Sequence, residues 1–494
     1  MVLQLFLTSV HEATSSPTLL ATIFSLDLAS RATSIAALRA DILNNNRNLE
    51  AEIAAQNYYG REWPGFDQLV KSYLTFVCDH GDPDAVYDRE AEFRSPLTVL
   101  SDLQAAFANR RGVVLTKLVA VTARYVLRSA QSNSYEDKEF CDTATSDTAG
   151  ILLKIFNSIR ADRSSSSSVI FNGTSVAGSI DGNFKPSHED ATAVSKRDVM
   201  LLIACLLCRA YFRINQPTAC ANVFANIRTA FASRGVEWAT YPLAQRVTLR
   251  YYLGVFYLFR QELQRARAHL QWAFVNCYYN GGDAGGLKNH RAILKYLIPV
   301  QILLGQSLSR QAFELAGLRL TAVFEPLARA AKQGDLCQFR YHLWQNVDWL
   351  VRSKLFVVLN SKAEILIFRN LFSRIDRIDQ QQQQQQQQIG DQDGANAKKK
   401  TNDLTFDQLL AGIKLSTRTL PSSALSPQQH QPSLDWTYDD IENVCVSLID
   451  QGFMKANIYT RSKVLRLMPS GGFPPLSQLW PLPQLVANGD EWLT

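Results

Sequence analysis

The chain has 494 residues, of which 46% are hydrophobic and 19% charged, a composition that suits two or three domains or one elongated solenoid. Its formal net charge of +6 is small for this length, so it permits an acidic partner without indicating nucleic acid by itself. The longest strongly apolar run, residues 201–208, is too short to span a bilayer, and the N-terminal MVLQLFLTSV lacks the basic start of a signal peptide. The eight cysteines are scattered, as is typical of reduced thiols, so we expect a soluble intracellular protein without a membrane segment.

The first region, residues 1–195, has helical patterning and almost no strand signal. Its periodicity predicts helices over 34–53, 66–77 and 113–127, and Pro96 is expected in the first turn of another helix. Residues 129–146 are polar and predict a loop. Residues 161–195 contain five consecutive serines and several glycines, which predicts a poorly ordered surface insertion.

A helical hairpin is predicted over residues 251–274. Small and large side chains recur there at the offsets of a tetratricopeptide-like repeat. They are Leu253, Gly254 and Tyr257 on the first helix, and Ala266, Leu270 and Ala273 on the second. Because Gly254 and Ala266 lack bulk, the two backbones can approach closely while Tyr257 and Leu270 fill the groove beside them. Such a hairpin buries its apolar face only between neighbours, so we expect a stack of helices.

The stack is predicted to occupy residues 196–365. An earlier, degenerate copy of the hairpin places Leu207, Cys208 and Tyr211 on one helix and Cys220, Phe224 and Ile227 on the next. Further helices are predicted over 291–305, with a kink at Pro299, and over 311–333 and 335–351. These patterns predict a mainly α fold, a TPR-like helical-repeat solenoid.

A winged helix is predicted over residues 366–470, followed by a C-terminal tail over 471–494. Within it, residues 380–400 begin with a glutamine run and end in three lysines, which predicts a solvated, mobile insertion. Helices are predicted over 404–415 and from the N-cap Thr437 to about Asp450, where Gly452 supplies the left-handed cap. Residues 453–468 predict a hairpin that turns at 459–462. With the amphipathic helix predicted over 367–376 (IFRNLFSRID), this gives three helices followed by a hairpin, the order of a winged helix.

A helical stack that runs directly into a winged helix resembles a PCI domain, the module shared by the proteasome lid, the COP9 signalosome and translation initiation factor three. The resemblance is narrowed by YYLGVFYLFRQELQRARAHLQWAFVNCY, NHRAILKYLIPVQILLG, AKQGDLCQF and DDIENVCVSLIDQGFMKANIYTRSKVLRL…GGFPPLSQLW. These stretches are similar to the branch that contains the PCI subunit of the nuclear transcription-export (TREX-type) complex and the COP9 signalosome subunit-twelve-like protein. The similarity covers roughly residues 197–480. The glutamine-rich insertion departs from it, so contacts at the entry to the winged helix are expected to differ.

The resemblance implies a non-catalytic scaffold subunit of a hetero-oligomer in the nucleus, without a cofactor. Members of the export type bind a large helical scaffold subunit and a small acidic protein shared with the proteasome lid, and their winged-helix surface contacts DNA or RNA. The alternative is a subunit of a COP9 signalosome-like or proteasome-lid-like assembly that binds protein only. In that case the wing would serve sheet pairing with other PCI subunits.

Basic residues are the candidate site. The hairpin 453–468 contains Lys455, Arg461, Lys463 and Arg466 and no acidic residue, and the region before it adds Arg369 and Arg374. One interpretation is a surface that follows nucleic-acid phosphates. The other is an ordinary solvated face, and composition alone favours this second interpretation.

No motif in the sequence supports an enzyme or a metal site. Cys205 and Cys208 form a C-x2-C pair, but no second pair lies at a suitable distance and the surrounding LLIACLLCRAYF is apolar and helical. We therefore interpret these cysteines as small buried side chains of the hairpin copy. The paired glycines at 281–286 predict a turn between helices rather than a phosphate-binding loop.

Overall fold

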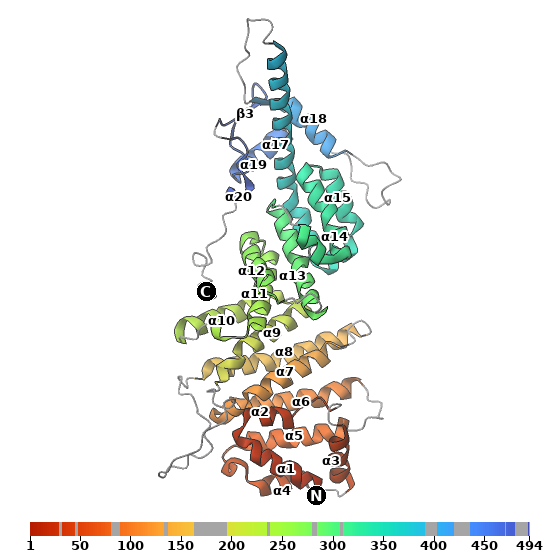
Figure 1. The fold of residues 1–494 in the computed structure, drawn as a ribbon, viewed down its shortest axis with the longest axis vertical. Helices are drawn as coiled ribbons and strands as arrows, with labels where there is room; N and C mark the ends of the chain where they lie inside the picture. The colour runs from red at the N-terminus through yellow and green to blue at the C-terminus, as the bar shows by residue number, and fades with distance from the viewer. Residues whose placement is uncertain are drawn as a thin grey trace. The chain divides into compact units, whose positions relative to one another are not determined.

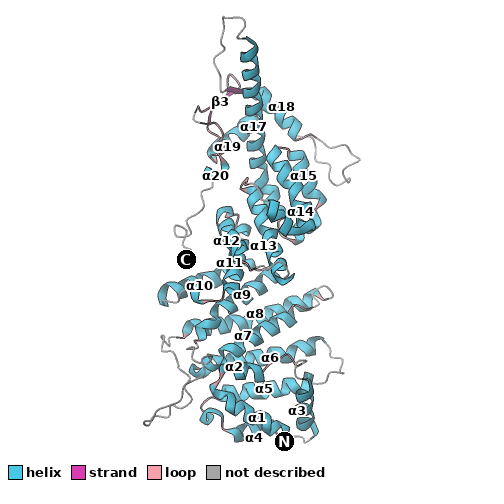
Figure 2. Ribbon diagram, viewed as in Figure 1, coloured by secondary structure: helices cyan, strands magenta, loops and turns pink. Residues whose placement is uncertain are grey.

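The computed structural model describes residues 1–28, 32–44, 48–80, 89–132, 137–162, 195–234, 238–278, 284–306, 310–390, 403–418, 435–469, 471–479 and 493. Helices dominate this part of the chain, and its strands belong to one small sheet (Figure 2). The mainly α class is therefore as predicted. None of the described helices is long and apolar enough to cross a membrane. The chain forms two compact units, residues 1–252 with 492–494, and residues 253–491, a division that coincides with neither predicted boundary at 195/196 or 365/366.

The first unit is a succession of helices in which neighbours from α5 to α9 contact each other in chain order (Figure 1). Their apolar faces form a continuous core, with Phe66, Tyr73 and Phe107 fully buried. The helices are α1 (Val2–Glu12), α2 (Pro17–Ile23), α3 (Ala32–Asn44), α4 (Leu49–Gln56), α5 (Pro64–His80), α6 (Arg89–Ala108), α7 (Thr116–Ala130), α8 (Lys138–Ala161), α9 (Met200–Arg213), α10 (Cys220–Arg234) and the first part of α11 (Leu243–Phe259).

Two helix starts in this unit differ from the sequence prediction. α6 begins at Arg89, so Pro96 lies inside the helix, where it removes one backbone hydrogen bond without ending the helix. α8 begins at Lys138 because the Asp137 side chain caps it, accepting a hydrogen bond from the Phe140 amide at 3.0 Å. The predicted loop over 129–146 is therefore shorter. Most of the predicted insertion, residues 163–194, lies outside the described residues.

The predicted helical hairpin consists of α11 and α12 (Leu263–Asn276). A Cβ atom placed on Gly254 would lie 2.5 Å from Leu270 Cγ and 3.2 Å from the Ala266 carbonyl oxygen, so a side chain has no room there. Ala266, Leu270 and Ala273 are fully buried, and Leu253 and Tyr257 are nearly so. Close approach at a small residue, with larger side chains beside it, is the packing that the sequence pattern predicts.

The stack continues through α13 (Ala284–Leu303), α14 (Arg310–Gln333), α15 (Leu336–Gln345), α16 (Val347–Arg352) and α17 (Phe356–Gly390). The turn between α14 and α15 rests directly on α17. Gly334 has a φ of +75° there, and a Cβ atom on it would lie 2.6 Å from the Leu371 Cα, so glycine is required for both reasons. Asp335 then caps α15 by accepting a hydrogen bond from the Gln338 amide at 3.0 Å.

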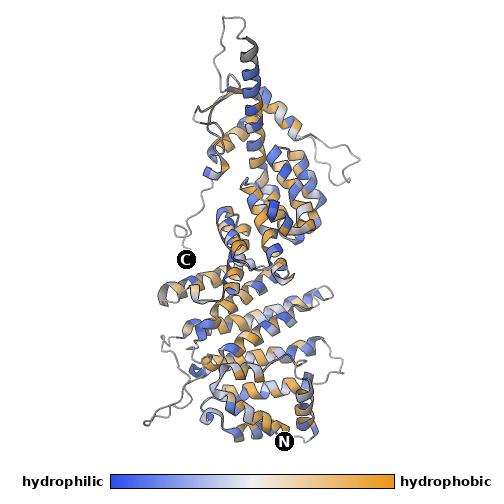
Figure 3. Ribbon diagram, viewed as in Figure 1, coloured by the Kyte–Doolittle hydropathy of each residue, from blue (hydrophilic) through white to orange (hydrophobic). Residues whose placement is uncertain are grey.

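The prediction of a mobile insertion from residue 380 is wrong for its first part, because α17 continues to Gly390. Glutamine is a good helix former, and side-chain hydrogen bonds between residues four apart support this segment. Gln380 donates to Asp376 at 2.9 Å and Gln383 donates to Asp379 at 2.6 Å. α17 accordingly changes from partly apolar to hydrophilic toward its C-terminal end (Figure 3). Residues 391–402 lie outside the described residues.

The winged helix packs on α17, with α18 (Phe406–Ser416), α19 (Tyr438–Asp450) and a sheet in the order β1-β3-β2. The strands are β1 (Asp403–Thr405), β2 (Ala456–Tyr459) and β3 (Val464–Leu467), both pairings being antiparallel. Thr437 caps α19 in a reciprocal hydrogen-bonding pair with Asp440, and Gly452 has a φ of +75°, as predicted. β1 was not predicted, and its pairing with β3 makes the hairpin part of a three-stranded sheet.

Residues 472–479, which we call the strap segment, return from the sheet to the end of the stack. The Lys455 amide donates to the Gly472 carbonyl at 2.7 Å, which fastens the strap segment to β2. At its other end lies α20 (Leu476–Leu479), where Leu476 occupies the space that a side chain on Gly305 would need. The strap segment therefore links the sheet to α13.

Candidate nucleic-acid interface

The predicted wing, residues 453–468, is a β-hairpin with one buried and one exposed face. Ala456, Leu465 and Leu467 are buried beneath the sheet. The opposite face carries Lys455, Asn457, Tyr459 and Arg466, all exposed. Alternate residues of a strand point to opposite faces, so Lys455, Asn457 and Tyr459 lie in one row along the β2 side. Arg466 of β3 lies beside this row, because it pairs with Asn457 in the sheet register. The hairpin thus presents a polar, basic and aromatic face to solvent.

Two of the predicted cations on this hairpin are available to bind a ligand. Lys455 and Arg461 are exposed, and neither side chain makes an ion pair or a hydrogen bond with the described residues. Lys455 lies at the base of β2 and Arg461 in the turn, and the four residue steps from Lys455 to Tyr459 alone extend about 13 Å. This spacing suits contact with separate phosphates of one nucleic-acid strand.

Lys463 follows the turn with a φ of +52°, and its ammonium group lies 3.8 Å from the centre of the Tyr438 ring. The Tyr438 hydroxyl donates a hydrogen bond to Asp407 at 2.6 Å, and this bond raises the tyrosine pKa. Lys463 therefore joins the wing to the start of α19 through a cation–π contact. Its charge remains exposed, and its position is fixed by the ring.

Arg466 is already paired. It donates to both carboxylate oxygens of Asp403, at 2.8 and 3.1 Å, across the β1–β3 ladder. This hydrogen-bonded pair holds the pKa of Asp403 below its ordinary value and raises the pKa of Arg466. The guanidinium also lies 5.2 Å from the Tyr459 ring centre. Arg466 thus stabilises the sheet and contributes less positive charge than the sequence suggests.

Arg369 and Arg374 lie on α17, outside the wing. Arg369 is half-buried and donates to the Pro474 carbonyl at 2.8 Å, so it holds the strap segment. Arg374 is exposed and makes a long contact with the Gln333 carbonyl at 3.4 Å. The six predicted cations therefore do not form one cluster along the chain: four belong to the wing hairpin, and two belong to α17, where each contacts a backbone carbonyl.

α19 has the opposite charge to the wing. It carries Asp439, Asp440, Glu442 and Asp450 and no lysine or arginine. The pKa of Asp440 is lowered by the backbone hydrogen bond at Thr437, which keeps this carboxylate ionised. Four carboxylates would repel a phosphate backbone, so α19 is poorly suited to enter a groove of DNA. Any nucleic-acid contact is therefore expected at the hairpin.

Tyr459 is the residue of this surface that the sequence interpretation missed. It is 44% exposed on the same face as Lys455. An exposed aromatic ring between cations is a feature of surfaces that bind single strands, because bases stack on it. The alternation K-x-N-x-Y over 455–459 was the available signal.

The cysteine pair is structural, as the sequence indicated. Cys205 and Cys208 are buried on α9, and burial raises the pKa of both thiols. Cys220 of α10, the second small position of the hairpin copy, raises the pKa of Cys208 further. Thiols kept protonated in this way are weak metal ligands. Within the described residues, no three histidine, cysteine or acidic side chains gather as a metal site.

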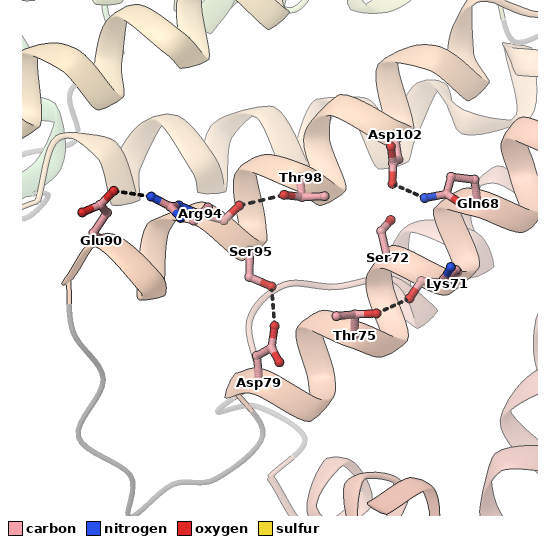
Figure 4. A pocket seen from close by; sticks show the side chains of 10 residues that line it. All are labelled: Gln68, Lys71, Ser72, Thr75, Asp79, Glu90, Arg94, Ser95, Thr98 and Asp102. Carbon is pink, nitrogen blue, oxygen red and sulfur yellow. Dashed lines mark hydrogen bonds and ion pairs between the residues drawn. The ribbon is translucent and has the colours of Figure 1, made fainter. Parts of the chain in front are cut away.

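The first unit contains a polar groove of about 500 Å³ between α5 and α6 (Figure 4). Its hydroxyl and carboxylate groups are engaged with one another or with their own helices. Ser95 donates to Asp79 at 3.2 Å, and Thr98 donates to the Arg94 carbonyl at 3.0 Å. Gln68 donates to Asp102 across the groove at 3.2 Å. The groove residues therefore join two helices, and no histidine is among the described residues that line the groove.

Comparison with known proteins shows which proteins this chain resembles in sequence. No family model matches the chain. The chain is 29% identical over 433 residues to a PCI domain-containing protein of Schizosaccharomyces pombe, a match that covers 85% of this chain and 82% of that protein. It is 26% identical over 283 residues to PCI domain-containing protein 2 of Xenopus laevis, covering 57% of this chain and 59% of that protein. It is 25% identical over 271 residues to the protein CSN12 homolog of Neurospora crassa, covering 54% and 53%. The chain thus spans little more than half the length of the latter two relatives.

The fold and the hairpin define a class of protein: a helical-repeat scaffold that ends in a winged helix. The relatives are proteins of the same class. The chain is similar to PCI domain-containing proteins and to the CSN12 homolog. This similarity supports a scaffold role.

Proposed function

We propose that this protein is a non-catalytic scaffold subunit of a nuclear complex that couples transcription to mRNA export, and that it contacts DNA or RNA through its wing. The observation that carries the nucleic-acid part is the exposed face of the hairpin. There Lys455 and Arg461 lack partners among the described residues, and Tyr459 lies between them. The scaffold part is supported by the fold and by the names of the relatives.

The wing would bind by following phosphates rather than by reading bases. Lys455 and Arg461 would each contact a phosphate, Lys463 would add a third from its fixed position, and Tyr459 would stack on a base. Two to four contacts of this kind predict a slope of about −2 to −4 when the logarithm of affinity for duplex DNA is plotted against the logarithm of salt concentration. Such binding is weak for one subunit, so partner surfaces would complete it.

The partners proposed are a large helical scaffold subunit and a small acidic protein of the proteasome-lid type. Both follow from the resemblance of residues 197–480 to the export branch of the family. A stack of helices with an exposed winged-helix end offers a long protein-binding surface, as repeat scaffolds do.

The alternative is a subunit of a COP9 signalosome-like assembly that binds protein only. Two observations favour it: the relative named CSN12 homolog, and the acidic α19 beside the wing. In this case the wing cations would meet acidic groups of a neighbouring subunit.

A gel-shift titration with two matched variants separates these functions. Lys455→Glu/Arg461→Glu reverses the available charges of the wing. Lys138→Glu/Lys154→Glu makes the same change of net charge at exposed positions of α8. Arg466 is left intact, because its replacement by glutamate would set a carboxylate against Asp403 and disturb the sheet.

We expect the wing variant to lose binding of RNA and duplex DNA while the α8 variant retains it, with both still recovering the same subunits in affinity purification. Equal binding by the two variants would contradict the nucleic-acid role. Loss of co-purifying subunits in the wing variant alone would favour the protein-only alternative.

A further inference from the structure

A cleft of about 450 Å³ lies among α13, α14, α17 and the strap segment, away from the wing hairpin in the sequence. Its charged lining is mainly cationic. Arg329 and Lys332 come from α14, Arg369 and Arg377 come from α17, and Glu325 is the one carboxylate among the described lining residues. The volume lies in the range of small-ligand sites.

Arg369 anchors this cleft. Two of its guanidinium nitrogens donate hydrogen bonds, to the Pro474 carbonyl at 2.8 Å and to Asn370 at 3.0 Å. Its Nε is buried and has no hydrogen-bond partner among the described residues. Burial lowers the pKa of Arg369, and the nearby charge of Arg377 lowers it further. A buried donor and a like charge beside it are both unfavourable without an anion, and an anion in the cleft would relieve both.

The other cations leave charge available for a ligand. Lys332 is exposed, and its side chain makes no hydrogen bond or ion pair with the described residues. Arg377 donates only its Nε, to the Ser373 carbonyl at 3.1 Å, which leaves its two terminal nitrogens for a ligand. Arg329 is paired with Glu325 at 2.9 Å, an exposed pair that competes little with a multiply charged anion.

Apolar side chains form much of the remaining wall, beside the polar Gln306 and Asn370. Ile302, Phe313, Leu366 and Leu476 line the cleft, and Leu476 is held there by its contact with Gly305. Apolar walls exclude water from part of the site and strengthen charge-assisted hydrogen bonds within it. The cleft is concave, whereas the wing face is an open strand surface, so the two suit different ligands.

We propose that this cleft is a binding site for a small polyphosphorylated molecule, held by Lys332, Arg369 and Arg377. The inference goes beyond the proposed function and does not depend on it. The ligand would bridge α14 and α17 and would stabilise the attachment of the strap segment through Arg369.

The test uses inorganic tripolyphosphate as the probe and isothermal titration calorimetry on the full chain. Lys332→Ala/Arg377→Ala removes two cations that make no side-chain ion pair in the described structure, so the fold should be retained, and the melting temperature without ligand checks this. We expect saturable binding to the wild type and a loss of at least about tenfold in the variant, since each cation donates charge-assisted hydrogen bonds. Lys455→Ala/Arg461→Ala, the matched change on the wing, should leave tripolyphosphate binding unchanged.

The same titration is repeated in the presence of a short RNA with a 5′-hydroxyl end. Unchanged tripolyphosphate affinity supports a separate small-molecule site. Displacement by RNA would overturn the proposal in favour of a nucleic-acid surface. It would also be overturned by absence of binding at low-millimolar probe, or by equal weakening in the cleft and wing variants.

Discussion

Two hairpins of this protein use their residues in opposite ways. In the helical hairpin of α11 and α12, the deciding residue is Gly254, whose missing side chain lets Leu270 and Ala266 approach. In the β-hairpin of the wing, the deciding residues are Lys455 and Arg461, whose long side chains extend into solvent. The packing of the first hairpin depends on the shape of its side chains, and the proposed binding by the second depends on their charge.

Because of this difference, substitutions in the two hairpins should affect different properties, stability in the first and binding in the second. A change at the helical hairpin should alter the free energy of unfolding, because the interior there is close-packed. A change at the wing should alter binding and leave stability nearly unchanged, because exposed cations without partners contribute little to folding. The following variants test that separation, beginning with the largest expected effect.

Gly254→Leu should destabilise the protein by about 1–3 kcal/mol, because a Cβ atom alone would lie 2.5 Å from Leu270 Cγ. Chemical denaturation followed by circular dichroism measures the change, and co-purification of partner subunits should weaken with it. Gly150→Leu is the matched control, since nothing lies within 4 Å of a Cβ atom at that exposed helical position. Equal stability of the two variants would contradict the packing role of Gly254.

Arg369→Ala should destabilise the protein by about 1–2 kcal/mol, because it removes two hydrogen bonds from a half-buried guanidinium and leaves the Pro474 carbonyl without its donor. Arg374→Ala, on the same helix but exposed, should change the free energy of unfolding by less than about 0.5 kcal/mol. Thermal unfolding of the two variants compares them directly. If Arg374→Ala were the more damaging, the assignment of Arg369 to the strap segment would be wrong.

Asp403→Asn should strengthen nucleic-acid binding severalfold. The carboxylate now accepts hydrogen bonds from Nε and one terminal nitrogen of Arg466 and neutralises its charge, and the amide would leave that charge to a phosphate. One additional phosphate contact should make the salt slope steeper by about 0.9 for duplex DNA. Fluorescence anisotropy over a salt series measures both quantities. Weaker binding by this variant would show that Arg466 acts only within the sheet.

Arg461→Ala should have the smallest effect on stability, within about 0.5 kcal/mol of the wild type, since its exposed side chain lies in the turn and makes no hydrogen bond or ion pair with the described residues. Its melting temperature and its nucleic-acid affinity should therefore separate, the first unchanged and the second reduced. A lowered melting temperature would contradict the expectation that the wing cations affect binding and not stability.

Local patterns in the sequence predicted much of this fold. The small residues of the helical hairpin, the Thr437 cap and the left-handed Gly452 each act on near neighbours, so their roles can be deduced from spacing. β1 escaped prediction because a strand of three residues has no measurable periodicity, and it exists through its pairing with β3. The continuation of α17 through the glutamine run could not be predicted from apolar periodicity, because a run of one polar residue has none, although glutamine is a good helix former.

The charges of the site were predicted only in part, for a related reason. Sequence shows that a cation is present but not which distant residue neutralises it. Arg466 is paired with Asp403, and Arg369 binds the Pro474 carbonyl, partners far away in the chain. Lys455 and Arg461 could be recognised as available only once their surroundings were known. The exposed position of Tyr459, in contrast, followed from strand alternation and could have been deduced.

The wing's role is tested most directly by the salt dependence of duplex DNA binding, compared between the wild type and Lys455→Ala/Arg461→Ala. If these two cations contact phosphates, the slope of log affinity against log salt should become shallower by about 2 in the variant. The variant should melt at the wild-type temperature. An unchanged slope, or a wild-type affinity that does not respond to salt, would contradict nucleic-acid binding through the wing.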